Sequence, residues 1–258
     1  MLKMMENLPA RPDPADLSSE IAALARRYRR ANGPVMSLVT KLGGSLEARV
    51  SLIPAALRVR IGRITETALA GAWGLAGAGA RRLPVGGRRG SLVAAAASGA
   101  LGGAGGLATS VAELPVAVAV ILHAIRREAV AAGFDPEDPS IRGACLQVFA
   151  AGSPLAEDDG IDTSFLSARL TLTGPALKRL IATVAPRLAA VLTQKLAAQA
   201  IPVLGAVTGA ALNTAFLSWY REIAAIRFAL LRLAETQGEK AVLAAFRSAI
   251  SSKPVSGA

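Results

Sequence analysis

The chain of 258 residues contains one cysteine, Cys145, and one histidine, His123. A single cysteine excludes an internal disulfide and a cysteine-based zinc cluster, and it fits a reducing cytoplasm. The histidine has no second histidine or glutamate at the spacing that zinc motifs require. We therefore interpret His123 as a core or interfacial residue, and we expect no metal and no cofactor.

A secretory signal is also missing from the first 30 residues. Pro9, Pro12 and Pro14 lie where such a signal would have its apolar segment, and charged sequence follows them. We expect a cytoplasmic protein.

Aromatic residues make up only 4% of the chain, although hydrophobic residues make up 52%. The core must therefore be built from Ala, Leu, Val and Ile, and alanine is the strongest helix former. A β-sandwich would use more Val, Thr and aromatic residues. We predict an all-α fold, with one domain of about eight helices over residues 17–251 between flexible tails at 1–16 and 252–258.

Helix-start and helix-stop signals divide this domain. A first helix is predicted from near Ser18 to a stop at Asn32-Gly33-Pro34, with an apolar face made of Ile21, Leu24, Ala25 and Tyr28. Further helices are predicted over 35–51, 54–83, 140–150, 175–200 and 238–251. Two apolar, Gly- and Ala-rich hairpins are predicted at 92–131 and 196–235, and in the second a long helix starts at Ala215 after a break at Pro202.

Basic residues are missing from the most glycine-rich segment, 99–106, because no Lys or Arg lies between Arg89 and Arg126. A P-loop needs a lysine followed by Ser or Thr after its glycines, so this segment does not match one. A dinucleotide-binding loop would need a preceding strand, which is not predicted here. We instead predict close helix packing at glycines spaced four apart: Gly99 with Gly103, Gly102 with Gly106, and Gly205 with Gly209.

Acidic residues are scarce in the N-terminal third. Residues 1–90 hold 15 Lys and Arg against 6 Asp and Glu, whereas residues 91–258 hold 14 against 12. A basic region beside a nearly neutral remainder indicates a face that meets polyanions. Two clusters of arginines are the candidate contact residues: Arg26, Arg27, Arg29, Arg30, Arg81, Arg82, Arg88 and Arg89.

An anionic membrane surface, or a membrane protein, is the partner that we expect for these arginines, since each basic residue near such a surface contributes about 1 kcal/mol. Nucleic acid is disfavoured because helix-turn-helix, zinc-finger and RNA-binding signatures are absent and aromatic residues for base stacking are scarce. An ordinary solvated arginine surface is the alternative.

Charge is nearly absent from two further segments. Glu113 is the only residue charged at neutral pH between Gly90 and Ile125, and residues 196–220 carry no charge. Both segments are long enough to cross a bilayer, but a charged group at its centre costs about 3 kcal/mol. Three interpretations stay open: hairpins buried in the core, which we favour, hairpins embedded in a membrane, and a switch between the two.

Glu113 is the candidate functional acid because it lies inside an apolar run. It would have a raised pKa if buried without a partner, and an enzyme of hydrolase type would pair it with His123 or Glu222. The competing interpretation, which we prefer, is a carboxylate in the first turn of a helix, just before Pro115, that interacts with the positive end of the helix dipole.

The order of these motifs resembles that of the EcsC family. The run from Gly99 to Pro115, ending in Glu113-Leu114-Pro115, is similar to the family's glycine-rich signature, except that aspartate is more usual at the acidic position. Ala132-Gly133-Phe134-Asp135, the stretch 201–213 and Leu52-Ile53-Pro54 also resemble the family, so the likeness covers residues 35–235. It implies a helical bacterial protein, cytoplasmic or at the inner membrane face. We expect a non-enzymatic, peripheral membrane protein, with an integral membrane protein or a hydrolase as alternatives.

Overall fold

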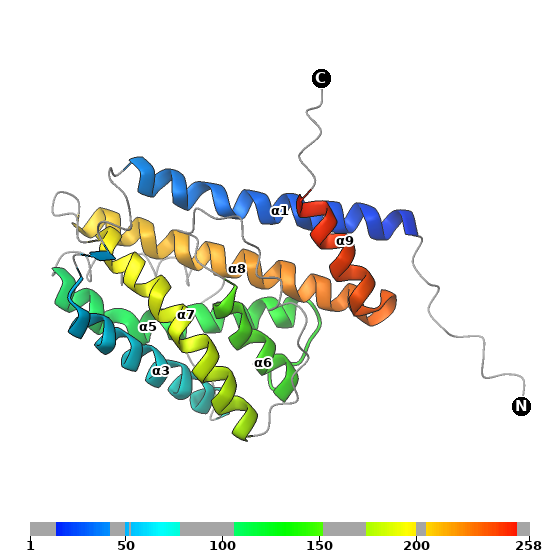
Figure 1. Ribbon diagram of the computed structural model, residues 1–258. Helices are drawn as coiled ribbons and strands as arrows, with labels where there is room; N and C mark the ends of the chain where they lie inside the picture. Colours follow the sequence, from blue (N-terminus) through cyan, green and yellow to red (C-terminus); the bar gives the residue numbers. More distant parts are fainter. Residues whose placement is uncertain are drawn as a thin grey trace, which may run out of the picture.

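The computed structural model describes residues 14–41, 50–51, 53–77, 106–151, 174–199 and 205–251. Within these ranges seven α-helices and one short 3-10 helix occur, and no strand (Figure 1). The predicted all-α fold is therefore confirmed. The elements are α1 (Pro14–Lys41), α3 (Ala55–Gly77), α5 (Gly106–Ala131), α6 (Pro139–Gln147), η2 (Val148–Ala150), α7 (Gly174–Gln199), α8 (Gly205–Gln237) and α9 (Glu239–Ser251).

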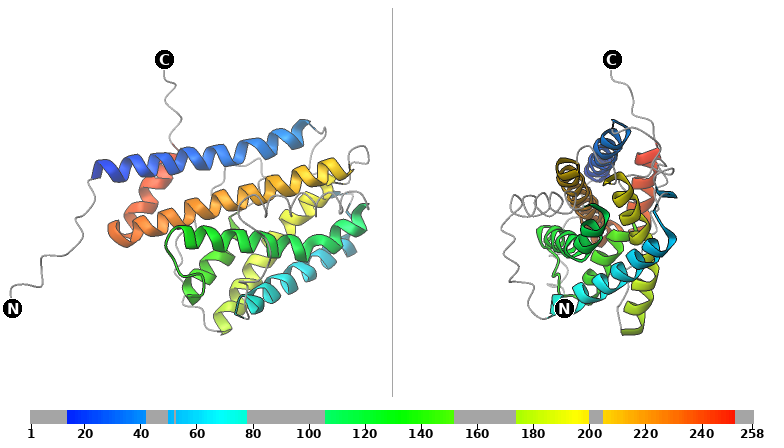
Figure 2. Two further views of the ribbon diagram at one scale, coloured as in Figure 1. Left: turned by 180° about the vertical axis from the view of Figure 1, so that it is seen from behind. Right: turned by 90° about the vertical axis from the view of Figure 1, so that its left-hand side faces the viewer.

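Helix α8 is the longest element and runs through the middle of the bundle. It packs against α1 and α9 on one side and against α5 on the other, and α5 in turn packs against α3. Helix α3 lies at the side opposite to α1, and α7, which packs closely against α3, runs obliquely from that side toward the start of α8 (Figures 1 and 2). The two ends of the N-terminal region, α1 and α3, are thus separated by the bundle core.

Helix α1 packs through the apolar face that the sequence predicts. Ile21, Leu24, Ala25 and Tyr28 are all buried, and the Tyr28 ring meets the Phe246 ring of α9 edge-on, with centroids 6.2 Å apart. Residues spaced three and four apart share one side of a helix, which is why these four face the core together.

The predicted bounds of the first helix are wrong at both ends. It begins at Pro14, inside the predicted tail, because proline fits the first helical position, where its missing N–H would have no partner. It continues through Asn32-Gly33-Pro34 to Lys41. A proline inside a helix removes one hydrogen bond and clashes with the preceding turn, but α1 as a whole is stabilised by its packing against α8.

The charge-poor segments lie in α5 and at the junction of α7 and α8. Residues 92–105 of the first predicted hairpin lie outside the described ranges, and α5 is one helix with Pro115 inside it. Helix α8 begins at Gly205, ten residues before the predicted start at Ala215, since an uncharged Ala-rich run continues the helical spacing. The sequence placed the α7–α8 break near Pro202, and α7 indeed ends at Gln199.

A tight turn joins α5 to α6. Gly133 has a φ of +82°, and two backbone hydrogen bonds close the helix end, from Gly133 N–H to the Val130 carbonyl and from Phe134 N–H to the Ala129 carbonyl. This is the Schellman arrangement, in which glycine accepts a left-handed conformation that other residues rarely adopt. Asp138 then caps α6 by accepting hydrogen bonds from Ser140 N–H at 2.7 Å and Ile141 N–H at 3.4 Å.

Among the described residues, one helical segment, Pro175–Ala197 of α7, is long and apolar enough to cross a membrane. Its most apolar window is 67% buried within the fold. A mostly buried core helix passes the same test of length and composition.

Candidate functional site

Three polar side chains from three helices meet in the apolar centre of the bundle. Glu113 of α5 accepts a hydrogen bond from the Nδ2 of Asn213 on α8, and the Nζ of Lys195 on α7 lies 3.9 Å from the same carboxylate oxygen. The side chains of Lys195 and Glu113 are only 3% and 8% exposed. We call these three residues the buried polar cluster.

The buried polar cluster corrects the preferred interpretation of Glu113. The residue lies about two turns beyond the start of α5 at Gly106, so it does not sit in the first turn beside the helix terminus. It is paired with a cation and an amide across the bundle instead. Glu113 and Asn213 are 100 residues apart and come from the two charge-poor segments, which therefore meet at their polar residues.

Burial lowers the pKa of the Lys195 ammonium, and the Glu113 carboxylate acts against that shift. Beside Lys195 and Asn213 lies an apolar cavity of about 20 Å³, enough for about one water molecule. It is walled by Ala117, Val120, Ile121, Leu192, Phe216 and Leu217. An amine and a carboxylate at this distance hold opposite charges together in a low-dielectric interior.

The residue pairs expected of a hydrolase are not formed. Glu222 holds Arg27 at 2.6 Å, while Glu113 is bound to Asn213. His123 lies half-buried on α5, and burial, followed by the charges of Arg127 and Arg126, lowers its pKa. Among the described residues no group of three or more His, Cys, Asp or Glu side chains could hold a metal ion.

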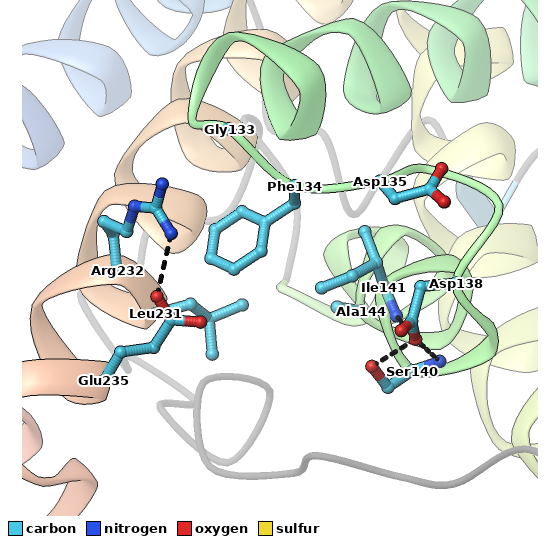
Figure 3. Close-up of a pocket in the computed structure, with 10 residues that line it drawn as sticks. All are labelled: Gly133, Phe134, Asp135, Asp138, Ser140, Ile141, Ala144, Leu231, Arg232 and Glu235. Atoms are coloured by element: carbon cyan, nitrogen blue, oxygen red, sulfur yellow. Dashed lines mark hydrogen bonds and ion pairs between the residues drawn. The ribbon is translucent and has the colours of Figure 1, made fainter.

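A pocket of about 300 Å³ opens where the α5–α6 turn faces α8 (Figure 3). Arg232 of α8 stacks over the Phe134 ring, 5.4 Å from its centroid, and its Nη1 donates to Glu235 at 2.9 Å. The hydroxyl and the backbone N–H of Ser140 satisfy Asp138. The Arg232 guanidinium thus already covers the aromatic face that a ligand cation would use.

In the predicted arginine cluster of α1, two side chains bind described residues of neighbouring helices and two do not. Arg27 is bound to Glu222 of α8, and Arg29 donates to the Ala249 carbonyl of α9 at 2.8 Å. Arg26 and Arg30 are exposed. The cluster therefore serves in part to fasten α1 to its neighbours. The second cluster, Arg81, Arg82, Arg88 and Arg89, lies outside the described residues.

The predicted packing glycines lie partly within the described helices. Gly106 is the first residue of α5, and Gly205 and Gly209 lie in the first turns of α8. Gly99 and Gly103 lie outside the described ranges. The role of these glycines in close helix packing stays a prediction.

Sequence reasoning missed two buried cations, Lys195 and Arg227. Arg227 is fully buried and donates to Gln147, and burial lowers its pKa to about 9. A signal was available for both, because each lies on the apolar face of its helix at three- and four-residue spacing from buried neighbours, such as Leu192 for Lys195. A charged residue on such a face is either paired or functional.

These observations define a class of protein: an all-α bundle with a basic N-terminal region and a polar cluster inside its apolar core. The model of the EcsC protein family matches residues 88–233, which is more than half of the chain. The chain belongs to the EcsC protein family. No curated protein and no solved structure matches it.

The family match runs from the glycine-rich segment through most of α8, so it contains all three residues of the buried polar cluster. The predicted resemblance of Leu52-Ile53-Pro54 falls before the matched residues, as do α1 and α3.

Proposed function

We propose that this EcsC-family protein binds anionic membrane surfaces peripherally, from the cytoplasmic side, through its basic N-terminal region. The function proposed is recognition and not catalysis. A bilayer that contains anionic lipid attracts basic residues held near its surface, and several exposed arginines on a folded domain suffice for association without insertion.

One observation carries the proposal. Where the structure describes the side chains of α1 and α3, it contains seven arginines and only two glutamates, and six of the seven arginines are exposed. Helices of soluble proteins usually mix both signs on their outer faces, which limits long-range attraction. The described part of the N-terminal region instead presents an excess of cations to the solvent.

A non-enzymatic function is supported by the use that the core makes of its ionisable groups. Glu113, the candidate acid, is hydrogen-bonded to Asn213 and paired with Lys195 in the interior. A catalytic acid must reach its substrate within hydrogen-bond distance. The adjoining cavity of about 20 Å³ is too small for any substrate larger than water.

The test is flotation of the purified full chain with vesicles of phosphatidylcholine alone and of phosphatidylcholine mixed with phosphatidylglycerol. Each is run at about 0.1 M and about 1 M salt, between which the Debye length falls from about 10 Å to about 3 Å. Peripheral binding through arginines predicts flotation only with the mixed vesicles and only at the lower salt concentration.

Flotation that survives high salt would show insertion of apolar segments and would contradict the peripheral mechanism. Absence of flotation under every condition would overturn membrane binding altogether. A carbonate wash of the membranes of producing cells adds an independent readout, because it releases a peripheral protein and leaves an integral one in place.

A further inference from the structure

We infer that the membrane meets the face formed by α3 and α7, and not the arginines of α1. The inference rests on the proposed function and names the surface that performs it. We call this surface the α3–α7 face, defined by the exposed basic residues Arg58, Arg60, Arg63, Lys178, Arg179 and Arg187.

The fold forces a choice between two basic surfaces. Helices α1 and α3 lie at opposite sides of the bundle, with α8 and α5 between them (Figures 1 and 2). A bilayer is flat on the scale of one domain, so it cannot contact both sides at once. The basic N-terminal region is therefore continuous in sequence and divided in space.

Two of the arginines on α1 already make contacts within the fold. The guanidinium of Arg27 is neutralised by Glu222, with contacts at 2.6 Å and 3.1 Å, and Arg29 binds the last turns of α9 through the Ala249 carbonyl. Guanidinium groups that are held in ion pairs lose most of their attraction for a second anion. Among the exposed arginines on the described part of this helix, Arg26 and Arg30 lie outside these contacts.

The α3 side keeps its cations exposed. Arg58, Arg60 and Arg63 are all exposed, and no hydrogen bond or ion pair joins their side chains to another described residue. The only acidic residue on the described part of α3 is Glu66. Between the first two arginines lies Val59, a large hydrophobic residue with 55% of its surface exposed.

Helix α7 adds further cations beside α3. It packs closely against α3 and carries Lys178, Arg179 and Arg187, all exposed. The whole helix contains no acidic residue. The two helices together present six exposed cations against one exposed carboxylate.

This composition suits a lipid surface better than a folded polyanion. Arginines bind phosphate groups of the headgroups in bidentate geometry, and Val59 among them is placed to enter the boundary between headgroups and acyl chains, as apolar residues of interfacial helices do. Base stacking on nucleic acid would need exposed aromatic side chains, and residues 55–71, the part of α3 whose side chains the structure describes, contain no aromatic residue.

The experiment compares two triple variants of the full chain that lose the same charge on opposite sides. The first is Arg58→Gln, Arg60→Gln and Arg63→Gln on α3. The second is Arg26→Gln, Arg30→Gln and Lys240→Gln on α1 and α9, where all three residues are exposed. Glutamine removes the charge and has nearly the same helix propensity as arginine and lysine. Circular dichroism and the unfolding midpoint establish that both variants fold.

With phosphatidylcholine–phosphatidylglycerol vesicles we expect the α3 variant to partition about 100-fold more weakly than the wild type, and the α1–α9 variant to lose much less. Equal losses, or a larger loss in the α1–α9 variant, would overturn the inference and leave the proposed function standing. Failure of the wild type to bind would remove the proposed function itself. Binding of the wild type to RNA instead of vesicles, with the same dependence on α3, would replace lipid with nucleic acid.

A labelled cysteine gives a second measurement that does not depend on affinity. Cys145 is 1% exposed, and burial raises its thiol pKa to about 12, so a cysteine introduced at an exposed position is labelled selectively. A polarity-sensitive fluorophore on Val59→Cys should shift to the blue when mixed vesicles are added. The same fluorophore on Ser248→Cys, exposed on α9, should not shift. A shift at position 248 and none at 59 would place the membrane on the opposite side.

Discussion

Lys195 and Glu113 carry opposite charges inside the apolar centre of the bundle, together with Asn213. Transfer of such a pair from water costs several kcal/mol per ion, which its mutual attraction only partly offsets. The loss of one partner is therefore far more damaging than the loss of both. This asymmetry makes the buried polar cluster testable by stability alone.

We expect Lys195→Met to lower the free energy of unfolding by about 3 kcal/mol, because it leaves the Glu113 charge buried without its cation. The double variant Lys195→Met with Glu113→Gln should recover most of that loss, since glutamine keeps the contact with Asn213 and carries no charge. Urea unfolding followed by circular dichroism measures both. A double variant as unstable as the single one would show that the ion pair is not the source of the effect.

At the scale of single residues, His123 should also make the stability of the fold depend on pH. Burial, with Arg127 and Arg126, lowers its pKa below the ordinary value of 6.5. As the pH falls through that value, the unfolded chain takes up a proton that the folded chain does not, so the free energy of unfolding decreases. Urea titrations between about pH 7 and pH 5 should show this slope in the wild type and a flatter one in His123→Gln. Equal slopes would mean that other groups dominate the window.

At the scale of the elements, the α5–α6 turn depends on one glycine. A Cβ atom at position 133 would lie 2.7 Å from Arg232 Nη2, and the φ of +82° is unfavourable for any residue with a side chain. Gly133 thus sets both the end of α5 and the stacking of Arg232 on Phe134.

We expect Gly133→Ala to destabilise the fold by about 1–2 kcal/mol. The matched control is Gly62→Ala within α3, where an added Cβ meets nothing within 4 Å and alanine should stabilise the helix by up to about 1 kcal/mol. Thermal unfolding of the two variants gives the comparison. Effects of the same sign at both positions would contradict the role assigned to the turn.

Helix positions followed from local patterns, whereas several helix ends did not. The face of Ile21, Leu24, Ala25 and Tyr28 was predictable from its spacing and is buried as expected. The stop predicted at Asn32-Gly33-Pro34 was wrong, because a helix gains most of its stability from tertiary packing, here of α1 against α8, and not from local signals alone. The start of α8 was placed too late because uncharged sequence carries few boundary signals.

The whole molecule protects its only thiol, on α6, behind the packed helices α5 and α7. We expect Cys145 to react with a thiol reagent only after the bundle opens, since its exposure is 1% and its pKa is raised to about 12. The labelling rate of the native protein should rise with added urea in step with global unfolding. Fast labelling in buffer would show that α6 detaches by itself.

Composition and spacing by themselves determined the helical class, the apolar faces and the basic character of the N-terminal third, because these depend on residue types and on periods of three to four residues. Tertiary structure alone decided which charged side chains are held in ion pairs within the fold and which are exposed to solvent. It pairs Glu113 with Lys195 across 82 positions and Arg27 with Glu222 across 195, and it sends α1 and α3 to opposite sides of the bundle. Such partners are chosen by the three-dimensional packing of helices, which no local pattern records.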